Sequence, residues 1–320
     1  MNNSYFMGRD GFIWFTGVVE DRGDPSYLGR VRVRCFGYHT EDTVAIPTED
    51  LPWAHVMMTV HDPSMNGLGN SPSFLVEGTW VVGFFRDPDA LQEPVVIGTL
   101  PGVPTVPSTG IKGFEDPSAY YPLRLNEPDT NRLAVNDPAN PHPIVQSKDL
   151  NRTINVPVAN TPDVIWDEPT DVTVLENGEN IRHNPSYPYN HVFESESGHI
   201  REMDDTTGSE RIHEYHRSGT FYEIDADGNK VTRIVGDQYE IVAGTNYVNV
   251  KGDVNLTIDA NCNTYIKGNW NIQVDGTKTE VVTGTVTETY KTSQTTNITG
   301  TLDLNASVEV DIDAGEINLN

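Results

Sequence analysis

The sequence predicts an all-β chain in which an N-terminal barrel, an extended connector and a C-terminal β-helix of eight-residue repeats follow one another. Three observations carry this prediction. Glycine returns at every eighth position over the last hundred residues, Val or Ile precedes these glycines at a constant spacing, and five short β-type runs fill residues 12–103. A fixed short period indicates a repeat architecture, because each repeat adds one unit to the same stack.

The glycine register starts at residue 228 and runs through ten slots, of which Ala260 and Thr292 occupy two. The other eight are glycine, and two positions before the slots lies Val or Ile in eight of the ten cases. Apolar and polar residues alternate within an octad, as in 250–257, which is typical of a half-buried strand with a turn at the glycine. We take the octad glycines as the structural positions of the repeat: Gly228, Gly236, Gly244, Gly252, Gly268, Gly276, Gly284 and Gly300.

An octad supplies one strand and one corner, which is too little for one chain to enclose a core. We therefore predict an intertwined triple-stranded β-helix (a β-prism) in a homotrimer, where every strand edge pairs with a neighbouring chain. A single-chain solenoid with two or more octads per turn is the alternative. The alternation tightens from Leu302 and slips at Gly315, which puts Ile317 and Leu319 in the opposite phase.

A few polar residues occupy positions that the alternation places inward, namely Lys278, Glu280, Glu288 and Gln294. Three copies of a charge on one axis are costly unless they are paired, hydrated or bound to an ion. These layers therefore have either a wet core or rotated faces, and the sequence leaves both open.

Composition excludes several classes of function. The chain has 320 residues and a formal net charge of −26, which disfavours nucleic acid and anionic membranes as partners. No apolar run is long enough to span a membrane, and the N-terminus lacks the pattern of a signal peptide. Cys35 and Cys262 lie in unrelated segments, so we expect free thiols.

Residues 12–103 contain five predicted strands, at 14–20, 29–36, 53–60, 79–85 and 94–100, separated by Pro, Gly and Asp clusters. Five strands in about ninety residues indicate a small closed barrel, of which the oligonucleotide-binding (OB) fold is the commonest kind. In the second strand we expect the valines inward and Arg30, Arg32 and Arg34 outward. With five Arg, no Lys and twelve Asp or Glu, this segment is too acidic for a phosphate-binding groove.

The barrel segment carries a specific family resemblance. The motifs are WFTGVVEDR at 14–22, LGRVRVR at 28–34, IPTEDLPW at 46–53 and GFEDP at 113–117, with shorter matches at 24–25, 76–79 and 96–99. Over about the first 120 residues they resemble the central spike of T-even-like contractile phages. The octads are similar to the needle of the same family and to the valine-glycine repeat proteins of type VI secretion.

The resemblance implies an OB barrel that attaches a trimeric spike to the trimeric hub of the baseplate. The Arg30, Arg32 and Arg34 stripe could then meet an acidic hub surface, or form a solvated barrel face. Spikes of this family also carry a cap protein or a histidine-based iron site at the tip. No histidine follows His216, so a separate cap protein is the expected partner at the C-terminal end.

Residues 104–190 depart from the family pattern. In the T-even-like spike this place holds a lysozyme domain, whereas here thirteen of the twenty-one prolines fall in a segment of about ninety residues. No helical stretch could place a general-acid Glu near a second carboxylate, so we expect an extended connector and no enzymatic activity. The expected divisions are an arm at 1–11, the OB barrel at 12–103, the connector at 104–190, opening strands of the prism at 191–227 and the octad needle at 228–320.

Other polar groups are weak candidates for sites. Asp225–Asn229 resembles the start of a calcium loop but lacks the later ligands, so a turn is favoured. His213 and His216 fall on opposite faces of a strand, so we do not expect them to share a metal ion. The pairs Glu194/Glu196 and Asp204/Asp205 could be read as catalytic carboxylates, but we favour a solvated acidic face. We therefore expect no catalytic, cofactor-binding or metal-binding residues, and no cofactor.

The hypothesis from the sequence is a structural central spike in the tail baseplate of a virion, assembled in the host cytoplasm. Its barrel docks on the hub, and its needle punctures the host outer membrane mechanically. The alternatives are a type VI secretion-like spike, which normally has a hub-like domain fused ahead of the barrel, and a spike that hydrolyses the cell wall.

Overall fold

The computed structural model describes residues 12–70, 72–106, 124–142, 144, 156–158, 161–166, 173–174, 180–181 and 185–317. The expected arm at 1–11, much of the expected connector at 104–190, and Leu319 lie outside these residues. The contacts divide the chain into two compact units, Met1–Thr257 and Ile258–Asn320. No helix within the described ranges combines the length and the hydrophobicity needed to cross a bilayer.

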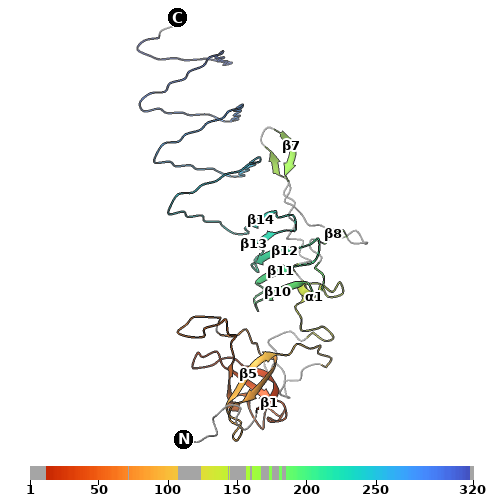
Figure 1. Ribbon diagram of the computed structural model, residues 1–320. Coiled ribbons are helices and arrows are strands. Elements are labelled where there is room, and N and C mark those ends of the chain that lie inside the picture. Colours follow the sequence, from red (N-terminus) through yellow and green to blue (C-terminus); the bar gives the residue numbers. More distant parts are fainter. Residues whose placement is uncertain are drawn as a thin grey trace. The chain divides into compact units, whose positions relative to one another are not determined.

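Five strands close into the predicted barrel, as Figure 1 shows at the N-terminal end of the ribbon. They are β1 (Ile13–Asp21), β2 (Val31–Cys35), β3 (Trp53–Val56), β4 (Trp80–Phe85) and β5 (Pro94–Thr99), with a 3-10 turn at Thr48–Asp50 before β3. The strand order around the barrel is β1-β2-β3-β5-β4. Neighbours are antiparallel except β3 and β5, which run parallel. The expectation of a five-stranded barrel is confirmed, with strand ends shifted by a few residues.

The barrel core is apolar and includes Val31 and Val33 as predicted. Its other buried members are Phe15, Val19, Cys35, Ala54, Leu75, Val81, Phe85 and Val96. Gly17 lies where β1 and β2 approach closely: a Cβ there would be 2.6 Å from the Arg34 carbonyl oxygen. Burial raises the pKa of the Cys35 thiol to about 12, so this thiol is inert at neutral pH.

A second sheet is a meander of five antiparallel strands in chain order. It consists of β10 (Asn190–Glu194), β11 (Ile200–Asp204), β12 (Arg211–Tyr215), β13 (Phe221–Ile224) and β14 (Lys230–Arg233). The turns at 195–199, 216–220 and 225–229 share one form, in which the fourth residue is a glycine with φ between 81° and 93°. Such turns match the twist of a hairpin, which explains the glycine at each of them.

The described part of the connector contains short elements only. The helix α1 (Arg132–Val135) begins after Asn131, whose side chain accepts from the Leu133 N–H. Two small hairpins pair β6 (Val156–Val158) with β7 (Thr161–Trp166) and β8 (Thr173–Val174) with β9 (Asn180–Ile181). Leu133, Ile144, Ile200 and Phe221 form an apolar cluster between α1 and the face of the second sheet.

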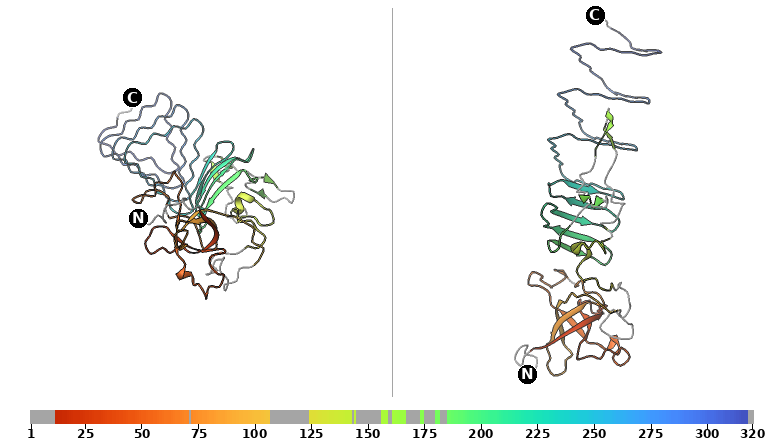
Figure 2. Two further views of the ribbon diagram at one scale, coloured as in Figure 1. Left: turned by 60° about the horizontal axis from the view of Figure 1, so that its bottom comes forward. Right: turned by 90° about the vertical axis from the view of Figure 1, so that its right-hand side faces the viewer.

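The octads form a regular but open backbone. Residues 234–317 contain no assigned strand, and every one of them is exposed. Figure 2 shows the segment beyond 258 as a trace that winds in successive turns without arrows. The strands predicted for the octads are therefore not formed in a single chain, because a strand needs a hydrogen-bonded neighbour and the coil supplies none.

Candidate functional sites

The backbone bends with a strict period of eight residues. Bends lie at 235–236, 243–244, 251–252, 259–260, 267–268, 275–276, 283–284, 291–292, 299–300 and 307–308. Seven of the predicted glycines are the second residue of a bend: Gly236, Gly244, Gly252, Gly268, Gly276, Gly284 and Gly300. Gly228 is different, because it lies in the hairpin turn between β13 and β14 with φ of 81°. The register therefore starts one octad later than expected.

A sharp turn usually needs glycine for its left-handed backbone conformation, but this is not the reason for glycine at these bends. None of the bend glycines from Gly236 to Gly300 has φ in the left-handed region, and a Cβ on any of them would meet no atom of its own chain. A single chain therefore tolerates a side chain at every bend. Any requirement for glycine must come from other molecules that approach the bend.

The apolar residues of the octads also lack cover within the chain. Those two positions before the second residue of each bend, which is glycine except at Ala260 and Thr292, have exposed fractions between 37% and 54%: Ile234, Val242, Val250, Ile258, Ile266, Val274, Val282, Tyr290 and Ile298. Other apolar octad residues, such as Val248 and Leu256, are about 80% exposed. An apolar column of this length is far more than a soluble monomer usually exposes.

Two of the unexpected polar residues pair with each other. The Lys278 Nζ lies 2.7 Å from the Glu280 Oε2, and the Tyr290 hydroxyl donates to Glu288 over 3.1 Å. Side chains two apart on an extended segment share a face, so a positive and a negative charge are paired on the face of Lys278 and Glu280. Pairing is one of the conditions under which such a layer can be buried.

The arginine stripe predicted for the barrel is wrong at Arg34. Arg34 is fully buried, and its guanidinium contacts both carboxylate oxygens of Glu20 at 2.5 and 2.9 Å. It also donates to the carbonyls of Thr40 and Ile46, because the loop after β2 folds over this face of the strand. Glu20 is the extra residue of a β-bulge in β1, between the pairs Val19–Val33 and Asp21–Arg32.

The other arginines of the barrel are paired as well. Arg30 pairs with Asp24. Arg32 lies 3.6 Å from Asp21 and 4.6 Å from the centroid of the Trp53 ring. The remaining ion pairs are those of Arg22 with Glu77 and Glu196, and of Arg86 with Glu93. Asp24 also accepts from the backbone N–H groups of Ser26, Leu28 and Arg30. The hydrogen bond from Arg30 holds the pKa of Asp24 well below its usual range. All five barrel arginines thus have acidic partners within the chain.

A buried polar cluster lies on the face of the second sheet that α1 covers. Arg211 donates to Glu202 at 2.6 Å and to Glu223 at 3.0 Å. Asn190 donates to Glu202 at 2.7 Å, and the His213 Nδ1 lies 3.2 Å from the same carboxylate. Alternate residues of adjacent strands supply the cluster, so the sheet register holds it together.

We expect the stability of this sheet to fall as the pH drops below about 6.5. Desolvation lowers the pKa of His213, with Arg211 acting in the same direction and Glu202 and Glu223 opposing it. A folded-state pKa below the unfolded value of about 6.5 means that the unfolded chain binds the proton first, at up to about 1.4 kcal/mol per pH unit. Melting temperatures between pH 8 and pH 5 test this expectation.

The variant His213→Gln should flatten that pH dependence, whereas His191→Gln should leave it unchanged because the His191 side chain is 69% exposed. His39 and His55, whose pKa values burial also lowers, belong to the barrel and add a pH dependence to the unfolding of the barrel only. An equal slope in the wild type and in His213→Gln would contradict the assignment.

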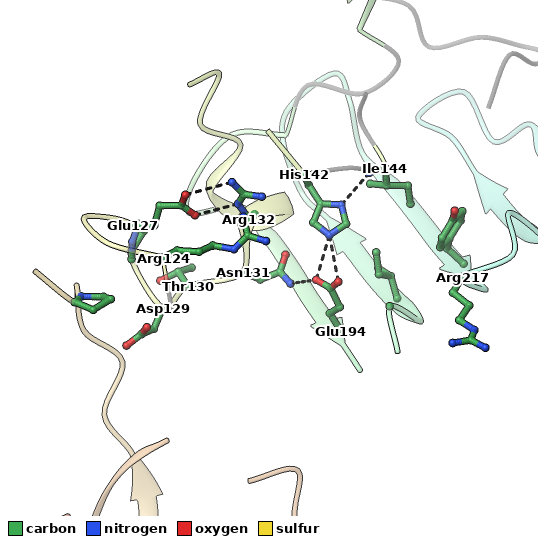
Figure 3. A pocket seen from close by; sticks show the side chains of 15 residues that line it. Arg124, Glu127, Asp129, Thr130, Asn131, Arg132, His142, Ile144, Glu194 and Arg217 are labelled. Carbon is green, nitrogen blue, oxygen red and sulfur yellow. Dashed lines mark hydrogen bonds and ion pairs between the residues drawn. The ribbon is translucent and has the colours of Figure 1, made fainter. Parts of the chain in front are cut away.

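A cavity of about 640 Å³ lies between the segment around α1 and the end of the sheet (Figure 3). Asn131 donates to Glu194 at 2.6 Å, and the His142 Nε2 lies 3.2 Å from the same oxygen. The His142 Nδ1 accepts from the Ile144 N–H, so the Nε2 carries the proton that goes to Glu194. Both ring nitrogens are thus engaged.

Three carboxylates line the cavity: Glu127 pairs with Arg132, Asp129 accepts from the Gly102 N–H, and Glu194 is not arranged as a proton donor. Hydrogen bonds from His142, followed by those from Asn131, lower the pKa of Glu194, so it is ionised at neutral pH. A general acid needs the opposite, a carboxyl group whose pKa is raised. No group of three or more metal-binding side chains occurs among the described residues. Of the other groups weighed in the sequence, Asp225 accepts from Asp227 and Asn229 as the first residue of a hairpin turn.

Comparison with known proteins gives consistent matches. A model of the Gp5 N-terminal OB domain matches residues 37–177, which begin after β2 and include β3–β5. The chain is 46% identical over 267 residues to Protein Gp5 of Vibrio phage KVP40, covering 74% of this chain and 61% of that protein. It is 45% identical over 125 residues to the pre-baseplate central spike protein Gp5 of Enterobacteria phage T4, covering 38% of this chain and 21% of that protein. The chain therefore spans less than two thirds of the length of either relative.

Proposed function

We propose that this chain, whose residues 37–177 match the Gp5 N-terminal OB domain and which is 46% identical to Protein Gp5 of Vibrio phage KVP40 over 267 residues, is the structural central spike of a contractile-tail baseplate. In this role the barrel docks on the trimeric hub protein and the octads form the needle of a homotrimer. Its location is then the tail baseplate of the virion, in agreement with the name of the T4 relative, the pre-baseplate central spike protein. A cap protein on the last octads completes the needle.

The observation that carries the proposal is the open, periodic backbone of residues 234–317. Its bends recur every eight residues, its apolar column is exposed, and it contains no strand. An exposed column of Val and Ile of this length needs cover, and covering it also takes the backbone N–H and C=O groups away from water, so that they then need hydrogen-bond partners. Two further copies of the chain, wound around the same axis, supply both at once.

A trimer would also explain the bend glycines and the ion pair between Lys278 and Glu280. Three chains that meet at each bend leave no room for a side chain, although one chain alone does. In the same trimer each Lys278 brings a Glu280, so the layer holds equal numbers of positive and negative charges. Ladders shared between chains cannot open one chain at a time, which suits a needle that transmits the force of sheath contraction into the outer membrane.

Solution mass is the test of this assembly. Light scattering on the purified chain should give three times 35.5 kDa, and an unboiled SDS gel should retain that species. A monomeric mass would contradict the needle and would favour the single-chain solenoid.

We propose a mechanical rather than an enzymatic role. The cavity beside the sheet holds an ionised Glu194 whose oxygens are engaged by His142 and Asn131. Glycoside hydrolysis needs a protonated carboxyl group facing a second carboxylate across the substrate. Clearing of peptidoglycan in a zymogram of the purified chain would overturn this part of the proposal.

A further inference from the structure

Aromatic side chains remain exposed on the outside of the barrel, near the start of β1. Phe12, Trp14, Phe36 and Tyr38 are between 43% and 56% exposed, and we call these four residues the aromatic face. Trp14, Phe36 and Tyr38 line a shallow cavity of about 480 Å³ whose floor includes Val82 of β4. Aromatic residues that line a hollow are the usual anchors of protein interfaces.

The aromatic face packs against a buried ring of the barrel. Phe84 is buried, and its ring lies 5.1 Å from that of Phe12 and 5.7 Å from that of Trp14 in edge-on contacts. The Tyr38 hydroxyl donates to the Trp14 carbonyl oxygen over 3.3 Å. Side chains fixed in this way lose little conformational freedom when a partner binds.

The charge around the aromatic face restricts what can bind there. The loop that follows Tyr38 exposes Glu41 and Asp42, which we call the acidic rim, and neither has an ion-pair partner among the described residues. The five arginines of the barrel are already paired with carboxylates. An acidic rim repels nucleic acid and a second copy of the same barrel, and it favours a protein with Lys or Arg around an apolar patch.

We infer that the aromatic face, with Trp14 at its centre, is the surface through which the barrel binds the hub. The hub then presents an apolar patch with a basic rim. This inference rests on the proposed spike function and replaces the arginine stripe as the docking surface. In the complex, apolar side chains of the hub pack against Trp14 and Phe36. The basic residues of the hub then lie against the acidic rim.

Binding of the full-length chain to purified hub protein, measured by interferometry, tests the inference. Trp14→Thr should weaken binding at least about 30-fold, the usual loss for an aromatic anchor. Tyr27→Asn is the matched control and should leave the affinity unchanged. Tyr27 is 95% exposed in the turn after the far end of β1, and asparagine tolerates its φ of 55°. The solution mass and the melting temperature should stay at wild-type values in both variants.

The contribution of the acidic rim can be measured separately, in the rate of association with the hub. The double variant Glu41→Gln/Asp42→Asn should slow association with the hub and reduce its dependence on salt, with little change in dissociation. If Trp14→Thr melts early, Phe36→Ser, which lies in the loop after β2, tests the same face.

The outcomes separate the two proposals. Unchanged hub affinity in Trp14→Thr and Phe36→Ser overturns the docking surface and leaves the spike function standing. Loss of the trimeric mass, rather than of hub affinity, means that the aromatic face packs against a second copy, which also overturns it. A wild-type chain that does not bind the hub overturns both.

Discussion

Arg34→Met should lower the free energy of unfolding of the barrel by about 3–5 kcal/mol, because the change leaves the Glu20 carboxylate buried without its cation. Both side chains are fully buried, and the Thr48 hydroxyl still donates to Glu20 after the change. Urea unfolding followed by tryptophan fluorescence reports on this loss, since Trp14, Trp53 and Trp80 all belong to the barrel.

Arg86→Met is the matched control for this prediction. The Arg86 guanidinium lies 3.1 Å from Glu93, but the two side chains are 43% and 39% exposed. Exposed pairs contribute at most about 1 kcal/mol, so the control should unfold close to the wild type. Adding Glu20→Gln to Arg34→Met should recover part of the loss, since it removes the stranded charge. Equal effects of Arg34→Met and Arg86→Met would contradict the assigned burial.

Ile258→Asp should prevent the needle from assembling. In the proposed trimer the substitution places three carboxylates in one apolar layer, at a cost on the order of several kcal/mol for each chain. A single chain would hardly notice the change, because Ile258 is already 46% exposed there. The expected result is a loss of the trimeric mass in light scattering and of the SDS-resistant species.

Thr257→Asp introduces the same charge one residue earlier, on the opposite side of the extended segment. Its trimer should form as in the wild type. A normal mass for both variants would show that the column of Val and Ile does not face other chains, and the triple-stranded needle would then be untenable.

Local pattern was a good guide to the barrel strands and a poor one to their surroundings. Turn residues and β-branched runs located all five strands, and the alternation in β2 correctly placed Val31 and Val33 inside. Arg34 follows the same alternation, yet a loop folds over it and a bulge at Glu20 supplies its partner. Neither the path of that loop nor the bulge leaves a periodic signal in the sequence.

For the candidate sites too, the sequence predicted the local periodicity but not the contacts between distant residues. The eight-residue period appears directly in the bends, but Gly228 belongs to a hairpin whose turn glycine happens to fall in register. The aromatic face was missed because Trp14 and Phe84 look like ordinary strand residues, and only the barrel brings them beside Phe36 and Tyr38. The cluster around Glu202 was missed because alternating polar residues on a strand are usually taken to face solvent.

The contrast between the second sheet and the octads sets an order of events during folding. Strands β10–β14 hydrogen-bond to neighbours close in the same chain, so this sheet can form at a rate independent of protein concentration. The octads of the proposed trimer gain their hydrogen bonds only when three chains meet, so their folding rate should rise steeply with concentration. Until then each chain carries more than eighty residues without strand pairing, with their Val and Ile side chains exposed. A newly made chain is thus most vulnerable to aggregation and proteolysis in the interval between the two events.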